Sequence, residues 1–596
     1  MHNITYYYSM DQKIDRKHRK ISPFADDGRI VRIGLLGSFT LKGIKEALNV
    51  KCDELGLVAK SYVGRYDQYN QELLNGASGL YNFKPHITIL FIDLRDVLGE
   101  AYHFPYRLTS RGRRSLVREK TEQVLSLIKV FTRYGSGKLI LNNFSVPTHS
   151  MMGILENKQE FGFFEMVRSL NRSLEEALRG DPRTYVFDYD NFLSMRGKRE
   201  ASDDKMRYLA DMKLNQNLIP PLCDEYMRYI KAIKGKAKKC IVLDLDNTLW
   251  GGIVGEDGFN GIRLGPTPPG NVFVDLQKYL LSLSERGIVL AINSNNNPAD
   301  AMKVIAEHPC MVLRENSFAA ARINWDNKPN NMIALAKELN IGLDSMAYVD
   351  DDKRNRQLMR EMLPQVLVLE LPEDPALYLK ALKDCTDLDM LNITEEDKRR
   401  AVMYAHERKR KEARLLFDDI AGFLAHLDIK VKISRADDFS IPRISQLTQR
   451  TNQFNLTARR YGEDGLRSLI RKDRYEVYSI WVKDKYGDSG ISGAIIMKKA
   501  GDSLVLDNFL MSCRVLGRGI EKTAIAFCVE KARKEKAKYL ICEYIPTEKN
   551  IVIRDFLKNS KFACVKKVKK SEYWELDTKK KLERPSYIKV ISKCKS

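Results

Sequence analysis

The stretch CIVLDLDNTLWGG, residues 240–252, places two carboxylates directly after a short apolar run. The run at 240–243 predicts a buried strand, so Asp244 and Asp246 stand at its carboxyl end. Open α/β sheets bind their ligands at that end of their strands. Because buried charges are costly unless they are paired or hold a metal, the two aspartates indicate a functional site rather than a solvated surface.

The composition is that of a large protein made of reduced, globular domains. Its 596 residues are enough for about three or four domains. No apolar run approaches the ~18–20 residues that span a membrane, and residues 1–20 lack the apolar core of a secretory signal. Ten cysteines without C-x-x-C pairs predict free thiols. We therefore expect a cytoplasmic protein without a membrane partner.

The charge balance favours acidic partners. The chain carries 100 Lys and Arg against 78 Asp and Glu, a formal net charge of +22, which attracts nucleic acid, an acidic carrier protein or a phosphorylated metabolite. Residues 558–596 hold part of the excess, in runs such as Lys579-Lys580-Lys581. No aromatic-rich recognition motif accompanies these runs, so a solvated face or tail is the simpler interpretation, and nucleic acid is not the expected partner.

Apolar runs that alternate with helical stretches predict two parallel α/β domains followed by a domain of mixed helix and strand. Strands are expected at 33–37, 87–92, 138–141 and 185–187, and then at 240–243, 288–292, 346–349 and 366–369. A capping-box pattern at 394–397 predicts the start of a charged linking helix that ends near residue 417. The expected segments are an N-terminal extension (1–30), the first α/β domain (31–217), the second (238–385), a helical linker (386–426) and an α+β domain with a basic C-terminus (427–596).

The second α/β domain contains the groups that phosphoryl transfer through an aspartate requires. Asp244 is the candidate nucleophile and Asp246 the candidate proton donor. Ser294 can donate to a phosphate oxygen, and Lys328 offers a cation for the same oxygens. Mg²⁺ prefers carboxylate and phosphate oxygen. The expected Mg²⁺ ligands are Asp244, Asp246, Asp350 and Asp351.

The spacing of this set leaves room for only one or two helices between successive members. No large cap domain is therefore expected over the site. An open site suits a substrate that a macromolecule carries or receives.

The motif order D-x-D-x-T, Ser, Lys and a D-D pair resembles that of phosphotransferases of the haloacid dehalogenase (HAD) superfamily. The surrounding sequence KKCIVLDLDNTLWGGIVGEDG, residues 238–258, is similar to the sequences of FkbH-like proteins, which load glycerate units onto acyl carrier proteins. The resemblance covers roughly residues 240–575 and implies a capless Rossmann-like phosphatase domain. Two positions depart from it: Asn295 stands where relatives carry Lys, and Asn355 where they carry Glu. The charge lost at both positions bears on substrate choice, and Asn295 leaves open a three-carbon acid other than glycerate.

A glycine motif marks the C-terminal domain. Arg514, Gly517 and Gly519 form R-x-x-G-x-G ahead of an expected helix and resemble the pyrophosphate loop of the Gcn5-related N-acetyltransferase (GNAT) fold. A tight turn without a ligand is the alternative. Coenzyme A and acyl carriers share a phosphopantetheine arm, so the resemblance implies that this domain can hold a carrier's arm.

A thiol must accept the acyl group. Cys513 precedes Arg514 beside the glycine motif, and a neighbouring guanidinium favours the thiolate, so Cys513 is the candidate acceptor. The alternatives are a structural role for Cys513, the rival thiol Cys240, and a thiol on the carrier itself.

The first α/β domain resembles SGNH-type hydrolases through residues 37–40 (GSFT) and 142–145 (NNFS). That activity requires a late Asp-x-x-His, but no histidine lies between His149 and His308. We expect a non-catalytic domain of that fold, used for carrier docking or packing, with Ser38 as a helix cap.

By resemblance, the donor is 1,3-bisphosphoglycerate. A thiolate displaces its C1 acyl phosphate, Asp244 with Mg²⁺ removes the C3 phosphate, and the product is a glyceryl thioester on an acyl carrier protein.

The alternative functions are a phosphatase for another metabolite or for nucleic-acid ends, a phosphatase combined with acyl-coenzyme A acyltransfer, and a non-enzymatic scaffold. No P-loop motif of a kinase partner supports nucleic-acid end processing.

Overall fold

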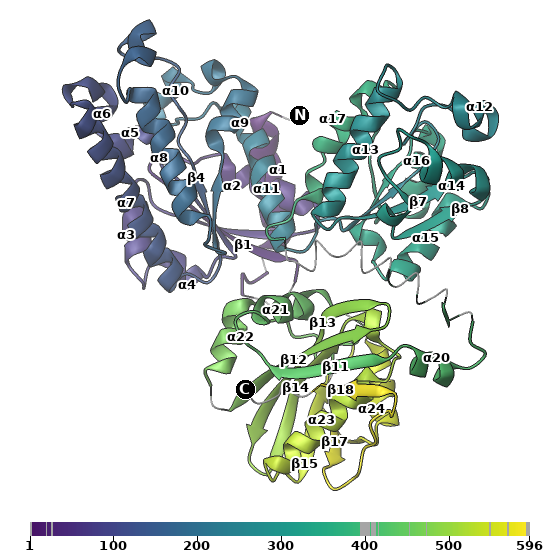
Figure 1. Cartoon of the computed structure of the whole chain (residues 1–596). Coiled ribbons are helices and arrows are strands. Elements are labelled where there is room, and N and C mark those ends of the chain that lie inside the picture. The colour runs from purple at the N-terminus through teal and green to yellow at the C-terminus, as the bar shows by residue number, and fades with distance from the viewer. Residues whose placement is uncertain are drawn as a thin grey trace. The chain divides into compact units, whose positions relative to one another are not determined.

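The computed structural model describes residues 3–19, 21–24, 28–393, 406, 410, 413–414, 416–451, 453–472, 474–547, 550–568 and 571–591 (Figure 1). By its internal contacts the chain divides into two units, residues 1–237 with 389–391, and residues 238–388 with 392–596. The capping-box pattern at 394–397 and most of the helix expected after it lie outside the described residues. No helix in the described ranges is long and apolar enough to cross a membrane.

The first unit is built on a parallel sheet of order β2-β1-β3-β4-β5. Its strands are β1 Ile30–Gly37, β2 Val58–Val63, β3 Ile87–Phe91, β4 Lys138–Asn142 and β5 Thr184–Phe187. Its helices are α1 Ile4–His18, α2 Ile44–Glu54, α3 Tyr69–Leu74, α4 Gly79–Phe83, α5 Leu94–Leu98, α6 Glu100–His103, α7 Ser110–Tyr134, α8 Phe163–Leu178, α9 Tyr189–Arg196, α10 Asp204–Ala210 and α11 Ile219–Ile233.

Helices cover both faces of this sheet, as parallel sheets require (Figure 1). One apolar core joins α1, α2 and α11 to the sheet, and a second joins α7 and α8 to the other face. The first 30 residues, expected as an extension, contain α1, whose Ile4, Tyr7 and Ile14 are buried in the first core.

The second parallel sheet has the order β10-β9-β6-β7-β8. Its strands are β6 Cys240–Leu243, β7 Val289–Ser294, β8 Ala320–Ile323, β9 Met346–Val349 and β10 Leu367–Val368. Its helices are α12 Val254–Gly261, α13 Gly270–Glu285, α14 Pro298–Glu307, α15 Lys328–Leu339, α16 Lys353–Met362 and α17 Tyr378–Lys383. β6 is central and fully buried, and its alternate side chains enter different cores: Ile241 and Leu243 enter one, Cys240 and Val242 the other.

The C-terminal domain has an eight-stranded sheet of order β16-β17-β15-β14-β13-β12-β11-β18. Neighbouring strands are antiparallel except for the parallel pairs β14·β15 and β11·β18. The strands are β11 Ile429–Arg435, β12 Tyr475–Asp484, β13 Gly487–Ala500, β14 Ser503–Met511, β15 Tyr539–Tyr544, β16 Ala563–Val568, β17 Ser571–Asp577 and β18 Ile588–Val590. The helices are α20 Ile420–His426, α21 Ile441–Arg450, α22 Glu463–Ile470, α23 Ile520–Lys534 and α24 Ile551–Asn559. The expected fold classes, parallel α/β and then α+β, are confirmed.

Candidate active site

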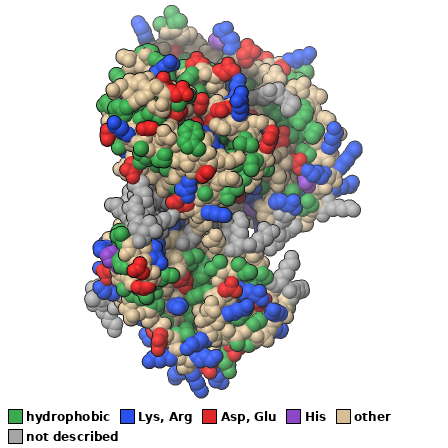
Figure 2. Space-filling model, turned by 90° about the vertical axis from the view of Figure 1, so that its right-hand side faces the viewer, with side chains coloured by type: hydrophobic (Ala, Val, Ile, Leu, Met, Phe, Trp, Pro, Cys, Tyr) green, Lys and Arg blue, Asp and Glu red, His purple; other side chains and the backbone are tan. Residues whose placement is uncertain are grey.

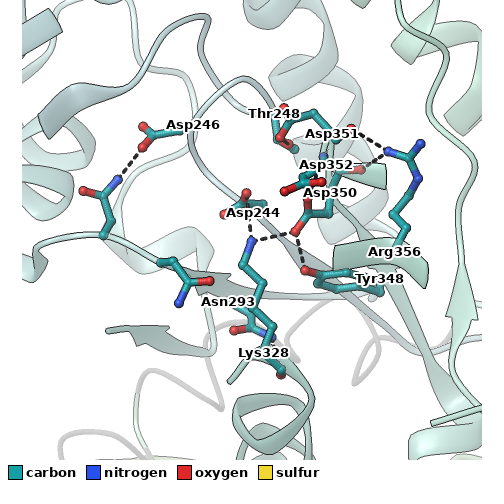
Figure 3. A network of polar contacts seen from close by, with 12 residues as sticks. Asp244, Asp246, Thr248, Asn293, Lys328, Tyr348, Asp350, Asp351, Asp352 and Arg356 are labelled. Atoms are coloured by element: carbon teal, nitrogen blue, oxygen red, sulfur yellow. Dashed lines mark hydrogen bonds and ion pairs between the residues drawn. The ribbon is translucent and has the colours of Figure 1, made fainter. Parts of the chain in front are cut away.

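The order of the second sheet brings the predicted site residues together. β9 and β7 are the two neighbours of β6, and Leu243 pairs with both Val349 and Ile292. The three strands therefore end side by side. Asp244 follows β6, Asp350 follows β9 and Ser294 ends β7, so these residues lie at the carboxyl end of the sheet. Figure 3 shows Asp244 beside Asp350, and the Ser294 side chain interacts with Asp244.

Three carboxylates form the centre of the site. Asp244, Asp350 and Asp351 each offer a carboxylate oxygen, and these atoms lie within 4.8 Å of one another. Lys328, the first residue of α15, places Nζ 2.6 Å from Oδ2 of Asp350 and 3.0 Å from Oδ2 of Asp244. The Tyr348 hydroxyl also donates to Oδ2 of Asp350 (Figure 3). One cation thus faces three acids.

Asp244 retains an oxygen without a partner. Its side chain is almost completely buried, yet Oδ1 accepts no hydrogen bond from the described residues. A buried carboxylate oxygen in this state is costly unless it meets a cation or a reacting group. The donor set consists of carboxylate oxygens, which suit a hard divalent cation such as Mg²⁺. The residues present therefore fit the metal that the HAD resemblance implies.

The acids hold protons more tightly than usual. Burial raises the pKa of Asp244 to about 6; Lys328 opposes the rise and Asp350 adds to it. Burial, together with the charges of Asp244 and Asp350, raises the pKa of Asp351 to about 7. Burial lowers the pKa of Lys328, but the two aspartates outweigh burial and raise it above its ordinary value. The lysine is therefore charged, and the carboxylates share more negative charge than it can balance.

Asp246 lies apart from the three carboxylates. Its Oδ1 accepts from Trp250 Nε1 at 2.8 Å and from the Val254 amide at 3.2 Å, and its Oδ2 accepts from Asn296 at 2.8 Å. Figure 3 shows this carboxylate directed away from Asp244. Burial raises its pKa, and these hydrogen bonds oppose the rise. Asp246 is thus placed as a group that can hold a proton, whereas the cluster of possible metal ligands found among the described residues consists of the other three acids.

Three further residues hold the carboxylates and the lysine of the site in place. Arg356 donates to the backbone oxygens of Asp350 and Asp351 at 2.7 Å each, and fixes the loop that carries both acids. The buried Asn293 donates to the Lys328 carbonyl at 2.9 Å. Thr248 donates to Asp351 Oδ1 at 3.3 Å. Thr248 belongs to the D-x-D-x-T pattern, and Arg356 lies only five and six residues after the two acids whose loop it fixes. The role of Asn293 depends on a contact with Lys328, 35 residues away, for which the sequence offers no signal.

The departure at Asn295 has a structural role. Its side-chain amide donates to the carbonyls of Asn324 and Asp326, at 3.0 Å each. These residues belong to the loop that precedes Lys328. Asn295 therefore ties the end of β7 to the loop that positions the lysine, and does not add a charge to the site.

The other candidates lie outside this cluster. Gly517 and Gly519 adopt positive φ angles of 75° and 80° ahead of α23, and Arg514 lies in a short turn of helix, Cys513–Val515. The side chain of Cys513 lies outside the described part of the chain. Ser38, expected as a helix cap, instead accepts the Asp93 amide through its hydroxyl at 2.9 Å.

Comparison with known proteins identifies the N-terminal part of the chain. Residues 32–231 match the family described as FkbH, N-terminal domain. This part of the chain is therefore similar to FkbH proteins. The chain is also similar to the crystal structure of the N-terminal part of the protein BF1531 from Bacteroides fragilis, which contains a phosphatase domain and was solved with Mg. The two are 27% identical with a TM-score of 0.56, over 64% of this chain and 99% of the other. The central domain is accordingly a HAD-type phosphatase domain.

The C-terminal quarter of the chain resembles acetyltransferase structures more distantly. A GNAT-family acetyltransferase from Desulfovibrio desulfuricans is 14% identical, with a TM-score of 0.21 over 25% of this chain and 99% of the other. The ribosomal-protein-S18-alanine N-acetyltransferase from Escherichia coli is 13% identical, with a TM-score of 0.20 over 25% and 94%. None of the curated proteins matches the chain.

Proposed function

We propose that this FkbH-like protein is a Mg²⁺-dependent phosphatase whose nucleophile is Asp244, and that it delivers the dephosphorylated glyceryl unit to the thiol of an acyl carrier protein. The observation that carries the proposal is the buried, unpartnered Oδ1 of Asp244 beside Asp350, Asp351 and Lys328. An acid in this state is available to attack phosphorus. The substrate proposed from the FkbH resemblance is 1,3-bisphosphoglycerate or a related phosphorylated three-carbon acid.

The phosphatase half uses two aspartates in turn. Oδ1 of Asp244 attacks the C3 phosphorus, the ester oxygen leaves, and Asp246 gives that oxygen its proton. Water, deprotonated by Asp246, then attacks the phosphorus of the aspartyl-phosphate, releases inorganic phosphate and restores Asp244. Ser294 donates to the phosphoryl oxygens, and Lys328 keeps the nucleophile ionised.

Asp244, Asp350 and Asp351 would hold the metal. Bound Mg²⁺ supplies positive charge that brings the phosphate and the carboxylates together. Asp246, which the sequence placed among the metal ligands, is left as the proton donor in this proposal because its oxygens are engaged by Trp250, Val254 and Asn296.

The transfer half needs a thiolate at the C1 carbonyl. The sulfur–carbon bond forms, the bond from C1 to the phosphate oxygen breaks, and the phosphate leaves with the electron pair. Cys240 is a poor candidate because it is fully buried, and burial raises the pKa of its thiol far above the ordinary value. The acceptor in this proposal is Cys513 or the thiol of the carrier.

A basic surface supports an acidic partner. Figure 2 shows Lys and Arg side chains gathered on the exposed face of the C-terminal domain. Arg533 donates to the carbonyls of Thr578 and Lys580, so the end of α23 adjoins the run at 579–581. The exposed basic residues here include Lys534, Lys536, Lys579, Lys580 and Lys581. Such a surface attracts an acidic carrier by long-range steering.

One experiment tests both halves. The full chain is incubated with Mg²⁺, 1,3-bisphosphoglycerate and a panel of holo-carriers, and released phosphate and the intact mass of each carrier are measured. We expect phosphate release and a carrier heavier by one glyceryl group. Asp244→Asn should lose C3 phosphate release, whereas Asp352→Asn, which alters only the cap of α16, should retain it. Release of the C3 phosphate without any glyceryl adduct would overturn the transfer half, and a C3 phosphate that stays on the three-carbon acid would overturn the phosphatase half.

A further inference from the structure

The parallel strands β14 and β15 separate part-way along their length. They pair from Ser503 with Tyr539 to Leu506 with Cys542, and the register ends there although both strands continue. The space beyond this point is the strand split. It is bordered by the backbone of β14 on the side away from β13, and β14 runs directly into the loop of Gly517 and Gly519.

The strand split is where an extended arm would bind. An arm whose pyrophosphate lay on the glycine loop would follow the free edge of β14. Its amides would then pair with the backbone N–H and C=O groups of that edge, as an added strand does. Coenzyme A and the phosphopantetheine of a carrier both have such an arm, so the split decides whether this domain can use either of them.

The chain itself fills the strand split with residues 453–457. The Leu456 amide donates to the Phe509 carbonyl, and the Met511 amide donates to the Phe454 carbonyl, at 3.0 Å each. Asn455 thus forms an antiparallel bridge with Leu510 of β14. On the other side, the Ile545 amide after β15 donates to the Leu456 carbonyl at 3.1 Å. The segment is therefore bonded to β14 and to the residue that follows β15, the two borders of the strand split.

The segment is also part of the domain core. Phe454, Asn455 and Leu456 are at most 1% exposed. The Phe454 ring packs against Phe509 and Phe556, with ring centres 5.2 and 5.4 Å apart. These side chains would have to leave the core before another chain could enter.

The buried side chain of Asn550, ahead of α24, donates to the Asn455 carbonyl at 3.0 Å. Asn455 in turn accepts the Ala458 amide at 3.0 Å. The segment is therefore held by side chains as well as by its backbone pairing.

The loop of Gly517 and Gly519 also makes contacts with other residues of the chain. The Gly517 amide donates to the carboxylate of Glu521 in the first turn of α23, and Glu521 is 7% exposed. A Cβ at Gly519 would lie 2.6 Å from the Tyr587 hydroxyl oxygen, so this residue packs directly over the loop. A diphosphate would meet a carboxylate of its own charge at the amide that should bind it.

We infer that the C-terminal domain does not accept the pantetheine arm of coenzyme A or of a carrier between β14 and β15, because residues 453–457 occupy that position as a built-in strand. The domain has a layout typical of coenzyme A users, but its own chain replaces the cofactor. Acyl-coenzyme A is therefore not a substrate at this position, and a carrier's arm binds elsewhere. This inference does not depend on the proposed phosphatase or transfer steps.

The direct test uses the full chain with coenzyme A and acetyl-coenzyme A. Binding is measured by isothermal titration calorimetry, and amide hydrogen exchange is followed at Leu456, Met511 and Ile545. We expect the three amides to keep the same protection with and without ligand. Binding accompanied by at least a tenfold loss of protection at these amides would overturn the inference. Binding that leaves them protected places the ligand outside the strand split, as inferred.

A cross-linked variant provides the control. Asn455 and Leu510 face each other as a pair flanked by hydrogen bonds, an arrangement in which Cα atoms are close enough for a disulfide. The double variant Asn455→Cys/Leu510→Cys, oxidised, locks the segment in the split. We expect equal coenzyme A titrations for the locked, the reduced and the unaltered protein. A ligand that binds the unaltered and reduced forms but not the locked form would show that the segment opens, contrary to the inference.

Discussion

Lys328 places its ammonium 2.6 Å from Oδ2 of Asp350, and both side chains are almost fully excluded from solvent, at 3% and 0% exposed. The same ammonium reaches Asp244. A buried ion pair of this kind contributes little when intact, but removing one partner leaves an uncompensated buried charge. The predictions for the site follow from this imbalance of one cation and three acids.

Lys328→Met removes the cation. We expect the free energy of unfolding of the phosphatase domain to fall by about 3–5 kcal/mol at pH 8 without Mg²⁺, because like-charged acids remain buried together. The loss should shrink at pH 5, where the carboxylates take up protons. Lys337→Met on the exposed face of the same helix is the matched control and should change little. Denaturant unfolding at the two pH values measures the difference; an equal loss at both would contradict the account.

Mg²⁺ affinity should depend strongly on pH. The pKa values of Asp244 and Asp351, about 6 and about 7, lie above the ordinary 3.8 of an unfolded chain. Between these values the native protein binds more protons than the unfolded protein, so metal-free stability falls as pH rises from about 4 to 7.

Mg²⁺ binding must displace those protons, so its affinity should increase from pH 5.5 to pH 7.5. Calorimetry in buffers of different ionisation enthalpy would count the protons released. An equal Mg²⁺ affinity at both pH values, without proton release, would contradict the raised pKa values of these two acids.

Removing the charge of Asp246 and removing that of Asp351 should affect different properties, catalysis in the first case and Mg²⁺ binding in the second. Asp246→Asn should lower turnover of an alkyl phosphate by roughly 10²–10⁴-fold, as expected for loss of a general acid, and should leave Mg²⁺ affinity nearly unchanged. The loss should be smaller for an aryl phosphate, whose leaving group needs no proton. Asp351→Asn should instead weaken Mg²⁺ binding. If Asp246→Asn weakened Mg²⁺ binding as much as Asp351→Asn does, its carboxylate would have to be a metal ligand.

Phe454→Ala should destabilise the C-terminal domain by about 3–5 kcal/mol, because it leaves a cavity beside Phe509 and Phe556. Phe439→Ala is a suitable control, since that ring is 86% exposed. Hydrogen exchange at the Leu456 amide reports the effect on this domain separately from the others. An effect no larger than that of the control would mean that the segment is not part of the core.

The phosphatase site could be predicted from the sequence because its signals are local. The strands before Asp244 and Asp350 are unbroken apolar runs, and the structure has them at the expected positions, 240–243 and 346–349. β2 and β8 were missed because they are short or half-buried and contain polar residues such as Lys60 and Arg322. A strand with one solvated face lacks the continuous apolar pattern of a central parallel strand.

Two features could not be predicted, for a different reason. The direction of the Asp246 carboxylate depends on a backbone turn in which Asn247 has a φ of 52°, and on Asn296 some 50 residues away. The insertion of residues 453–457 depends on pairing with Phe509 and Met511, and no spacing rule reports such a distant register. Spacing alone indicated a pyrophosphate loop, whereas the contacts around it show a loop that bonds to its own chain.

The central claim is that Asp244 takes the phosphoryl group. Acid quenching of the enzyme during turnover of a phosphorylated three-carbon acid with Mg²⁺, followed by peptide mass spectrometry, tests it directly. We predict a phosphoryl group on Asp244 that disappears when the substrate is exhausted and is absent from Asp244→Asn. A phosphoryl group on another residue, or phosphate release by Asp244→Asn at the unaltered rate, would contradict the account.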